Sequence, residues 1–324
     1  MNIKMKSFVQ RMAGVLIAVG ISTNAAAYPD KPINLVVVFG AGGTSDVVAR
    51  QVGQSLSDVL KTEVVVLNRP GAGGNVGATF VAKSVADGYT LLAGFPGLTT
   101  NAALYQKLGY DPEKDFIPIS LVASAPNVIV VPATSTAKTL KEFIAQAVQK
   151  PAGLSFGSAG AGSSSHLAGE LLKEITGLNF THVAYKGGTP ALVDLASGRL
   201  DLMIIPLPEA INLINSGKIK PLALASDHRS KLIPNVPTTR EAGLNDFVVG
   251  SWYGLLAPRG TPDKVVAALS NATSKALKSE GINKNFDTSG IEMVASTSDE
   301  FRKFLADETK RWRAVIEKNK IRLD

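Results

Sequence analysis

The chain has 324 residues, of which 45% are hydrophobic and 19% charged, so it is a compact globular protein with room for two lobes. It has no cysteine and only three histidines, none at zinc-ligand spacing, which excludes thiol catalysis and disulfides and predicts no metal site. The formal charge of +7 includes three basic residues before residue 28, and the remaining lysines and arginines are scattered, so we expect no nucleic-acid partner.

The first 27 residues have the three parts of a secretory signal peptide. Lys4, Lys6 and Arg11 precede the uncharged run 12–21, and the alanines 25–27 offer a small-residue cleavage site. The apolar run is shorter than the roughly 20 residues that span a bilayer. A short membrane anchor is the alternative, but the cleavage site disfavours it. We therefore expect cleavage after Ala27 and a mature protein in the periplasm.

From residue 28 onward, short apolar runs alternate with amphipathic segments. The apolar runs predict strands over 35–39, 64–67, 89–93, 127–131, 154–157, 180–184, 200–205, 220–225 and 252–257. Apolar residues at helical spacing predict helices over 44–61, 139–149, 164–176, 188–197, 207–216, 262–279 and 298–319, with a further short helix after residue 77. This alternation predicts an α/β fold with mostly parallel sheets. At this length, two smaller sheets with a cleft between them are favoured over one large sheet.

Three loops rich in Gly, Ser and Thr come directly before predicted helices, at 40–46, 157–166 and 185–190. Bare N–H groups at a helix N-terminus bind anions, and ligands of open α/β sheets lie beyond the carboxyl ends of the strands. Helix capping alone would explain one such loop. Three of them together predict a cleft for an anionic ligand.

Enzyme motifs fit less well. The glycines of 71–77 are one residue too widely spaced for a dinucleotide fingerprint, and there is no P-loop, so we expect no cofactor. Gly162 to His166 lacks the second glycine of a nucleophile elbow. We expect no catalysis, with a secreted serine hydrolase that uses Ser163 or a neighbour together with His166 as the alternative.

The ordered motifs of the chain resemble one family over the whole predicted mature sequence. These motifs are Tyr28-Pro-Asp-Lys-Pro-Ile33, Gly42-Gly-Thr-Ser-Asp46, Asn68-Arg-Pro-Gly-Ala-Gly-Gly-Asn-Val-Gly77, Ser165-His-Leu-Ala-Gly-Glu-Leu171, Tyr185-Lys-Gly187, Trp252-Tyr-Gly254 and Gly260-Thr-Pro262. In this order they are similar to the extracytoplasmic solute receptors of tripartite tricarboxylate transporters, the Bug family.

The resemblance implies a two-lobed periplasmic-binding-protein fold, type II-like, with the ligand between the lobes. The chain would cross between lobes near Pro126 and Gly250, so that 28–126 and 250–324 form lobe 1 and 127–249 form lobe 2. The implied function is capture of a small carboxylate by lobe closure and its delivery to membrane permease subunits, by a monomeric receptor. A ligand-sensing subunit of a membrane sensor kinase would use the same cleft and stays open as an alternative.

The resemblance also implies which residues hold the ligand, partly through ordered waters. They are Gly42, Gly43, Thr44, Ser45 and Asp46 in the first loop; Ser158, Ala159, Ser163, Ser164 and His166 in the second; and Lys186, Gly187, Thr189 and Pro190 in the third.

Ile205 departs from the family, whose members often carry an acid there. If this strand end faces the cleft, Ile205 adds apolar surface where relatives offer a partner for a ligand ammonium. We therefore expect Ile205 to line the site and the ligand to be a carboxylate without a free ammonium group. The alternative is that Ile205 lies in the core of its lobe and carries no information about the ligand.

Overall fold

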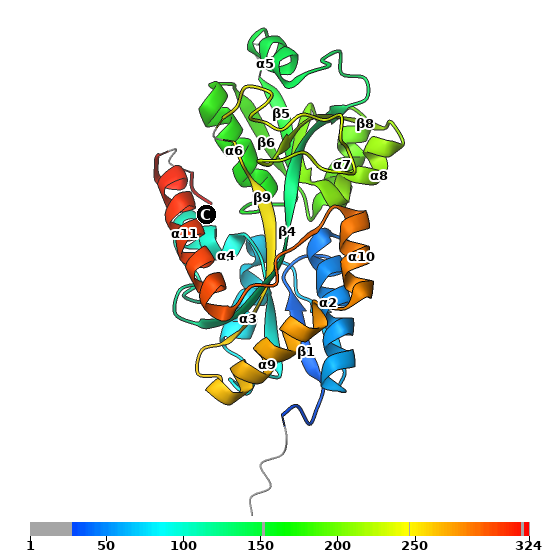
Figure 1. Ribbon diagram of the computed structural model, residues 1–324. Helices are drawn as coiled ribbons and strands as arrows, with labels where there is room; N and C mark the ends of the chain where they lie inside the picture. The colour runs from blue at the N-terminus through cyan, green and yellow to red at the C-terminus, as the bar shows by residue number, and fades with distance from the viewer. Residues whose placement is uncertain (1–27, 151–152, 246, 319–320, 324) are drawn as a thin grey trace, which may run out of the picture.

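The computed structural model describes residues 28–324 apart from 151–152, 246, 319–320 and 324. The predicted signal peptide therefore lies outside the described residues. In the described part of the chain, no helix is both long and apolar enough to cross a bilayer. The molecule is elongated, with two groups of strands and helices joined by two long strands near its middle (Figure 1).

Lobe 1 is built on β1 (Ile33–Val37), which pairs in parallel with β2 (Val64–Asn68) and β3 (Thr90–Gly94). Alternate residues of β1 point to opposite faces of the sheet, and both faces are covered. Leu35 packs in one core with residues of the helices on one side, and Val36 packs in another core with residues of the helices on the other side. Burial on both faces explains why this strand reads as an unbroken apolar run.

Lobe 2 repeats the arrangement around β5 (Leu154–Ser158). This strand pairs in parallel with β6 (Phe180–Ala184) and β7 (Leu202–Pro206). The remaining strand of the lobe, β8 (Ile219–Ala225), pairs antiparallel with β4 (Phe116–Pro132).

Two antiparallel strands, β4 and β9 (Gly250–Pro258), run between the lobes. Their pairing ends at Pro126 opposite Gly250, and from Asn127 onward β4 pairs with β7 and β8. On the other side, β9 pairs antiparallel with β3, and the short β10 (Glu292–Met293) pairs with β4. The strands of the two lobes are thus joined into one path through β4, in the order β2-β1-β3-β9-β4-β7-β5-β6.

The helices cover both faces of each lobe. Those of lobe 1 are α2 (Thr44–Leu60), α3 (Asn75–Ala82), α4 (Gly97–Leu104), α9 (Asp263–Ala276) and α10 (Glu280–Ser289), with a 3₁₀ turn at Ala72–Gly74. Those of lobe 2 are α5 (Leu140–Val148), α6 (Ser164–Thr176), α7 (Gly188–Ala196) and α8 (Leu207–Asn215). In lobe 2, α5 and α6 share one core, whereas α7 and α8 share the other.

The last helix, α11 (Ser298–Lys318), contacts both lobes. Near its start, Phe301 packs in a core of lobe 1, whereas Trp312 and Ile316 pack in a core of lobe 2. Lys318 pairs with Glu174 of α6 at 2.7 Å. The sequence predicts that all of 250–324 belongs to lobe 1, whereas the final turns of α11 also pack in the core of the second lobe. Their apolar face is buried against the second lobe, which helical spacing alone does not reveal.

Candidate functional site

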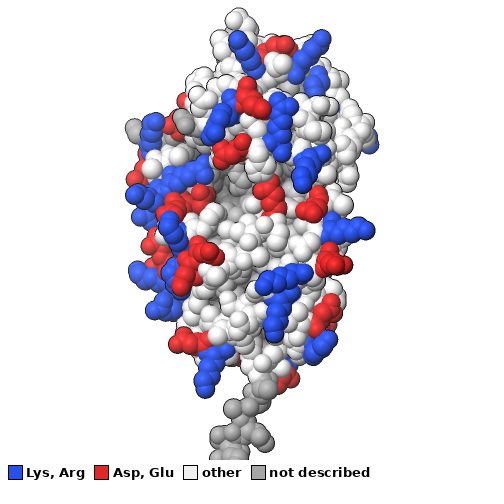
Figure 2. All heavy atoms as spheres, viewed as in Figure 1, with Lys and Arg blue, Asp and Glu red and all other residues white. Residues whose placement is uncertain are grey.

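The main candidate site is a cavity between the lobes, with about 690 Å³ of empty space that is partly open to solvent. Figure 2 shows the face of the molecule hollowed between its two halves. Lobe 1 contributes Phe39, Gly40, Ala41, Gly43, Thr44, Ser45 and Pro96; lobe 2 contributes Ala159, Ser163, Ser164, Ser165, Lys186, Gly187, Gly188, Thr189, Pro190, Pro206 and Glu209; and β9 contributes Ser251 and Tyr253. The N-termini of α2, α6 and α7 therefore meet at one cavity, as the three loops predict.

The first loop brings the start of α2 to the cavity. Gly43 is the N-cap and offers no side-chain cap, so the first N–H groups of the helix need other partners. Thr44 donates from its N–H at 3.4 Å and from Oγ1 at 3.1 Å to Oε1 of Glu209, which belongs to the other lobe. The N-terminus of α2 thus already holds a carboxyl group across the cleft.

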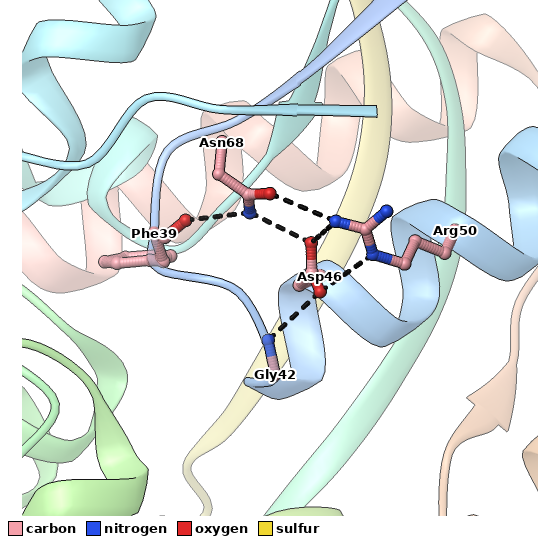
Figure 3. Close-up of polar contacts among 5 residues, drawn as sticks. All are labelled: Phe39, Gly42, Asp46, Arg50 and Asn68. Atoms are coloured by element: carbon pink, nitrogen blue, oxygen red, sulfur yellow. Dashed lines mark hydrogen bonds and ion pairs between the residues drawn. The ribbon is translucent and has the colours of Figure 1, made fainter. Parts of the chain in front are cut away.

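Asp46 holds the first loop in shape and does not line the cavity. Oδ2 accepts the Gly42 N–H at 3.0 Å and the Arg50 Nε at 3.0 Å, while Oδ1 accepts Arg50 Nη2 at 3.0 Å and Asn68 Nδ2 at 2.9 Å (Figure 3). Asn68 also donates to the Phe39 carbonyl at 3.1 Å. Burial alone would raise the pKa of Asp46, but the hydrogen bonds from Arg50, Gly42 and Asn68 together lower it. The structure therefore gives Asp46 and Gly42 a supporting position behind the cavity wall.

The second loop presents hydroxyl groups to the cavity. Ser163 caps α6 by accepting the His166 N–H at 3.3 Å, and it donates to the Gly160 carbonyl at 2.6 Å. The Oγ atoms of Ser164 and Ser251 lie 2.7 Å apart, which links lobe 2 to β9. The buried Oγ of Ser165 has no partner among the described residues and remains available to a ligand.

His166 lies behind this loop and does not line the cavity. Its Nδ1 accepts the Gly162 N–H at 3.2 Å, and its ring stacks on His182 at 4.1 Å between ring centres. Phe156 stacks on His182 at 4.8 Å. Burial, and then the neighbouring His182, lower the pKa of His166 to about 3, and burial lowers that of His182 to about 4. The two neutral rings thus form a packed support for the second loop.

The contacts of Ser163, His166 and His182 do not favour the alternative of a serine hydrolase. The Ser163 hydroxyl is used on a carbonyl of its own loop, and the His166 ring does not contact it. Ser158 Oγ does lie 2.6 Å from His182 Nε2, but Ser158 is fully buried and outside the cavity. Among the described residues, no group of three or more histidine or acidic side chains could hold a metal ion.

The third loop leads into α7. Gly187 has a φ of 125°, a conformation that favours glycine, and Lys186, Thr189 and Pro190 line the cavity as predicted. Gly188 touches the facing carboxyl group, since an added Cβ would lie 1.8 Å from Oε2 of Glu209. Only glycine fits there without displacing that side chain.

Ile205 is a correction to the predicted site. Its side chain is fully buried, it pairs with Val128 in the β4–β7 ladder, and it packs in the core shared with α7 and α8. It does not line the cavity, so the argument that linked it to a ligand without an ammonium group fails. The acid that lines the cavity is Glu209, four residues later.

Three residues that line the cavity were not predicted from the sequence: Glu209, Ser251 and Tyr253. Glu209 is the one charged residue between 202 and 215, in an otherwise apolar stretch, and this was the available signal. An acid in the first turn of a helix has a sufficient local explanation in the helix dipole, which hides such a signal. Tyr253 is buried, and this burial raises the pKa of its phenol.

Comparison with known proteins identifies the family. Residues 48–321 match the profile of the tripartite tricarboxylate transporter family receptors. The chain is 37% identical to protein BugT of Bordetella pertussis over 308 residues, which cover 94% of each chain. Rpa4515 of R. palustris, solved with adipate, is 36% identical, with a TM-score of 0.87 over 91% of this chain and 100% of that one.

A second solved relative is MatC of Rhodopseudomonas palustris, with bound malate. It is 34% identical, with a TM-score of 0.84 over 89% of this chain and 100% of that one. These likenesses confirm the predicted two-lobed α/β fold and the predicted family. The chain belongs to the receptors of the tripartite tricarboxylate transporter family.

Proposed function

We propose that this chain captures a small carboxylate in the cavity between its lobes and passes it to the permease subunits of a tripartite tricarboxylate-type transporter. The observation that carries the proposal is the meeting of three helix N-termini, those of α2, α6 and α7, at one cavity lined from both lobes. Each N-terminus carries a partial positive charge and bare N–H groups that suit carboxylate oxygens. The adipate and malate bound by two relatives support this ligand class.

The protein acts by closure, as a monomer in the periplasm, with cleavage after Ala27 and without catalysis of its own. We place the lobe boundaries at 126/127 and 249/250, which the pairing of Pro126 with Gly250 supports. The C-terminal turns of α11 are the exception, since they pack on lobe 2. Donors from both lobes face the cavity, so neither lobe alone satisfies a carboxylate.

A thermal-shift screen of residues 28–324 against succinate, malate, aspartate and adipate tests the ligand class. A ligand at 100 times its dissociation constant stabilises the folded state by about 2.7 kcal/mol, which raises the melting midpoint measurably. X-ray scattering with the best acid should show a smaller radius of gyration in the complex. A melting midpoint that none of the four acids raises would refute the proposal.

A further inference from the structure

Among the described residues, the cavity is lined by one carboxyl group, that of Glu209, and this group has no ion-pair partner. Among the residues that line the cavity, Glu209 is the only acid, and no described Lys, Arg or His forms an ion pair with it. Oε1 has the two Thr44 donors, whereas Oε2 is buried and has no hydrogen-bond partner among the described residues. A buried, ionised oxygen without a donor is costly, so this environment favours the neutral acid.

The electrostatic surroundings agree with the contacts. Burial raises the pKa of Glu209, and the two hydrogen bonds from Thr44 offset this only in part. Lys186 lines the same cavity, but its side chain is exposed and forms no ion pair with Glu209 in the described structure.

Glu209 lies between two of the helix N-termini that suit a ligand carboxylate. An added Cβ on Gly43, before α2, would lie 4.0 Å from Oε1, and one on Gly188, at the start of α7, would lie 1.8 Å from Oε2. A carboxylate held by either N-terminus is therefore a close neighbour of the Glu209 carboxyl group. Two carboxyl groups in one site do not both ionise cheaply, and such pairs share a proton.

We propose that Glu209 is a specificity-determining residue that meets the ligand as a neutral carboxylic acid and donates its proton to a ligand carboxylate oxygen. Ligand capture is then favoured for fully anionic acids, and affinity is lost when Glu209 gives up its proton to solvent. This inference rests on the proposed function, because it needs a carboxylate in the cavity. Glu209, and not the buried Ile205, is then the residue that selects among ligand acids.

Other titratable or charged groups on the surrounding elements do not replace Glu209 in this role. Lys186 and Tyr253 line the cavity beside it, while Asp46 and Arg50 lie on α2, the helix whose Thr44 contacts Glu209. Those on helices and strands packed against α8 are Asp194, Lys220, Glu280, Lys284 and Asp287, while β4 and β7 have none. Only Lys186 and Tyr253 line the cavity with Glu209, and the phenol of Tyr253 is fully buried with a raised pKa.

Calorimetric titration between pH 5.5 and 9.5 tests the proposal, with the acid that gives the largest thermal shift among succinate, malate, aspartate and adipate. Each pH is measured in two buffers of different ionisation enthalpy, which gives the protons taken up per ligand. For the wild type we expect a constant affinity for the fully ionised ligand at low pH, then a fall of about tenfold per pH unit. After subtraction of the protons that the ligand itself releases, proton uptake should rise from zero toward one over the same range.

The variant Glu209→Gln keeps a hydrogen-bond donor of the same shape without the titrating proton. We expect it to bind within a few-fold of the wild type at pH 5.5 and to lose both the pH dependence and the proton uptake. Glu209→Ala, which has no donor, should bind more than tenfold more weakly at pH 5.5. Glu63→Gln, an exposed change before β2, is the matched control and should titrate as the wild type does. Circular dichroism checks that each variant is folded.

Several outcomes would overturn the inference. One is a wild-type affinity that stays constant to pH 9.5 without proton uptake, and another is an unchanged pH dependence in Glu209→Gln. A third is a preference for aspartate over succinate that Glu209→Gln abolishes, since that would show an ionised Glu209 paired with a ligand ammonium. Binding with any of these results leaves the proposed function intact, whereas no binding of any of the four acids overturns both.

Discussion

The stacked histidines behind the second loop predict a steep loss of stability in mild acid. His166 and His182 are neutral in the folded protein, with pKa values lowered by burial to about 3 and about 4. In the unfolded chain a histidine titrates near 6.5. Below that pH the unfolded state binds more protons than the folded state, so the free energy of unfolding falls as pH falls from 6.5 toward the folded values.

The magnitude follows from the pKa difference. A pH of 5 is about 1.5 units below the pKa of a histidine in the unfolded chain, and each unit corresponds to about 1.4 kcal/mol of unfolding free energy. Acidification from pH 7 to pH 5 should therefore cost about 2 kcal/mol through His166. His182 adds a similar or smaller amount, because its side chain is only partly buried. The pair together should remove about 3–4 kcal/mol of stability, a large share of that of an ordinary domain.

Urea unfolding of residues 28–324 at pH 7 and pH 5 measures this loss. His182→Phe retains an aromatic ring for stacking and removes one titrating group, so its loss should be smaller by about 1–2 kcal/mol. His228→Gln replaces an exposed histidine and should lose as much as the wild type. Equal losses in His182→Phe and the wild type would refute the account of a neutral buried pair.

Three further predictions concern the loops. Gly188→Val should weaken acid binding at least tenfold in calorimetry, because its Cβ displaces the Glu209 carboxyl group, whereas Gly281→Ala has open space and should have no effect. Ser45→Ala should weaken binding by about 0.5–1.5 kcal/mol, since the backbone donors remain; no change would show that the Ser45 hydroxyl does not contact the ligand. Asp46→Ala should lower stability in urea unfolding by about 1.5–3 kcal/mol, because Gly42, Arg50 and Asn68 lose the hydrogen bonds that the buried Asp46 carboxylate accepts, and a loss below 0.5 kcal/mol would contradict the supporting role.

Most elements were predictable because their residues repeat at a helical or strand period, and the exceptions have local causes. The helix α4 was missed because Thr99, Thr100 and Asn101 are buried with its apolar residues, so no polar face marks it. The first half of β4 was missed because Pro118 and Pro126 argue against a strand. In the structure the β4–β9 register shifts just after Pro118, where an irregularity accommodates it.

The candidate site was predictable at its loops and not beyond them. Glycines and hydroxyl residues before helices mark anion sites locally, and these loops do line the cavity. Which side chains complete the wall depends on how the lobes meet, and no spacing encodes this for Glu209 or Tyr253. The strand that contains Ile205 is buried on both faces, so its sequence has no alternation that could tell core from cleft.

The central claim is that the cavity between the lobes binds an acid through its carboxylate. The most direct test is calorimetric titration of residues 28–324 with the best acid of the screen and with the matched amide, in which each carboxylate is replaced by a neutral carboxamide. The account predicts saturable, one-to-one binding of the acid and affinity for the amide lower by at least tenfold, since the helix N-termini favour negative charge. Equal affinity for both compounds, or binding of neither, would contradict it.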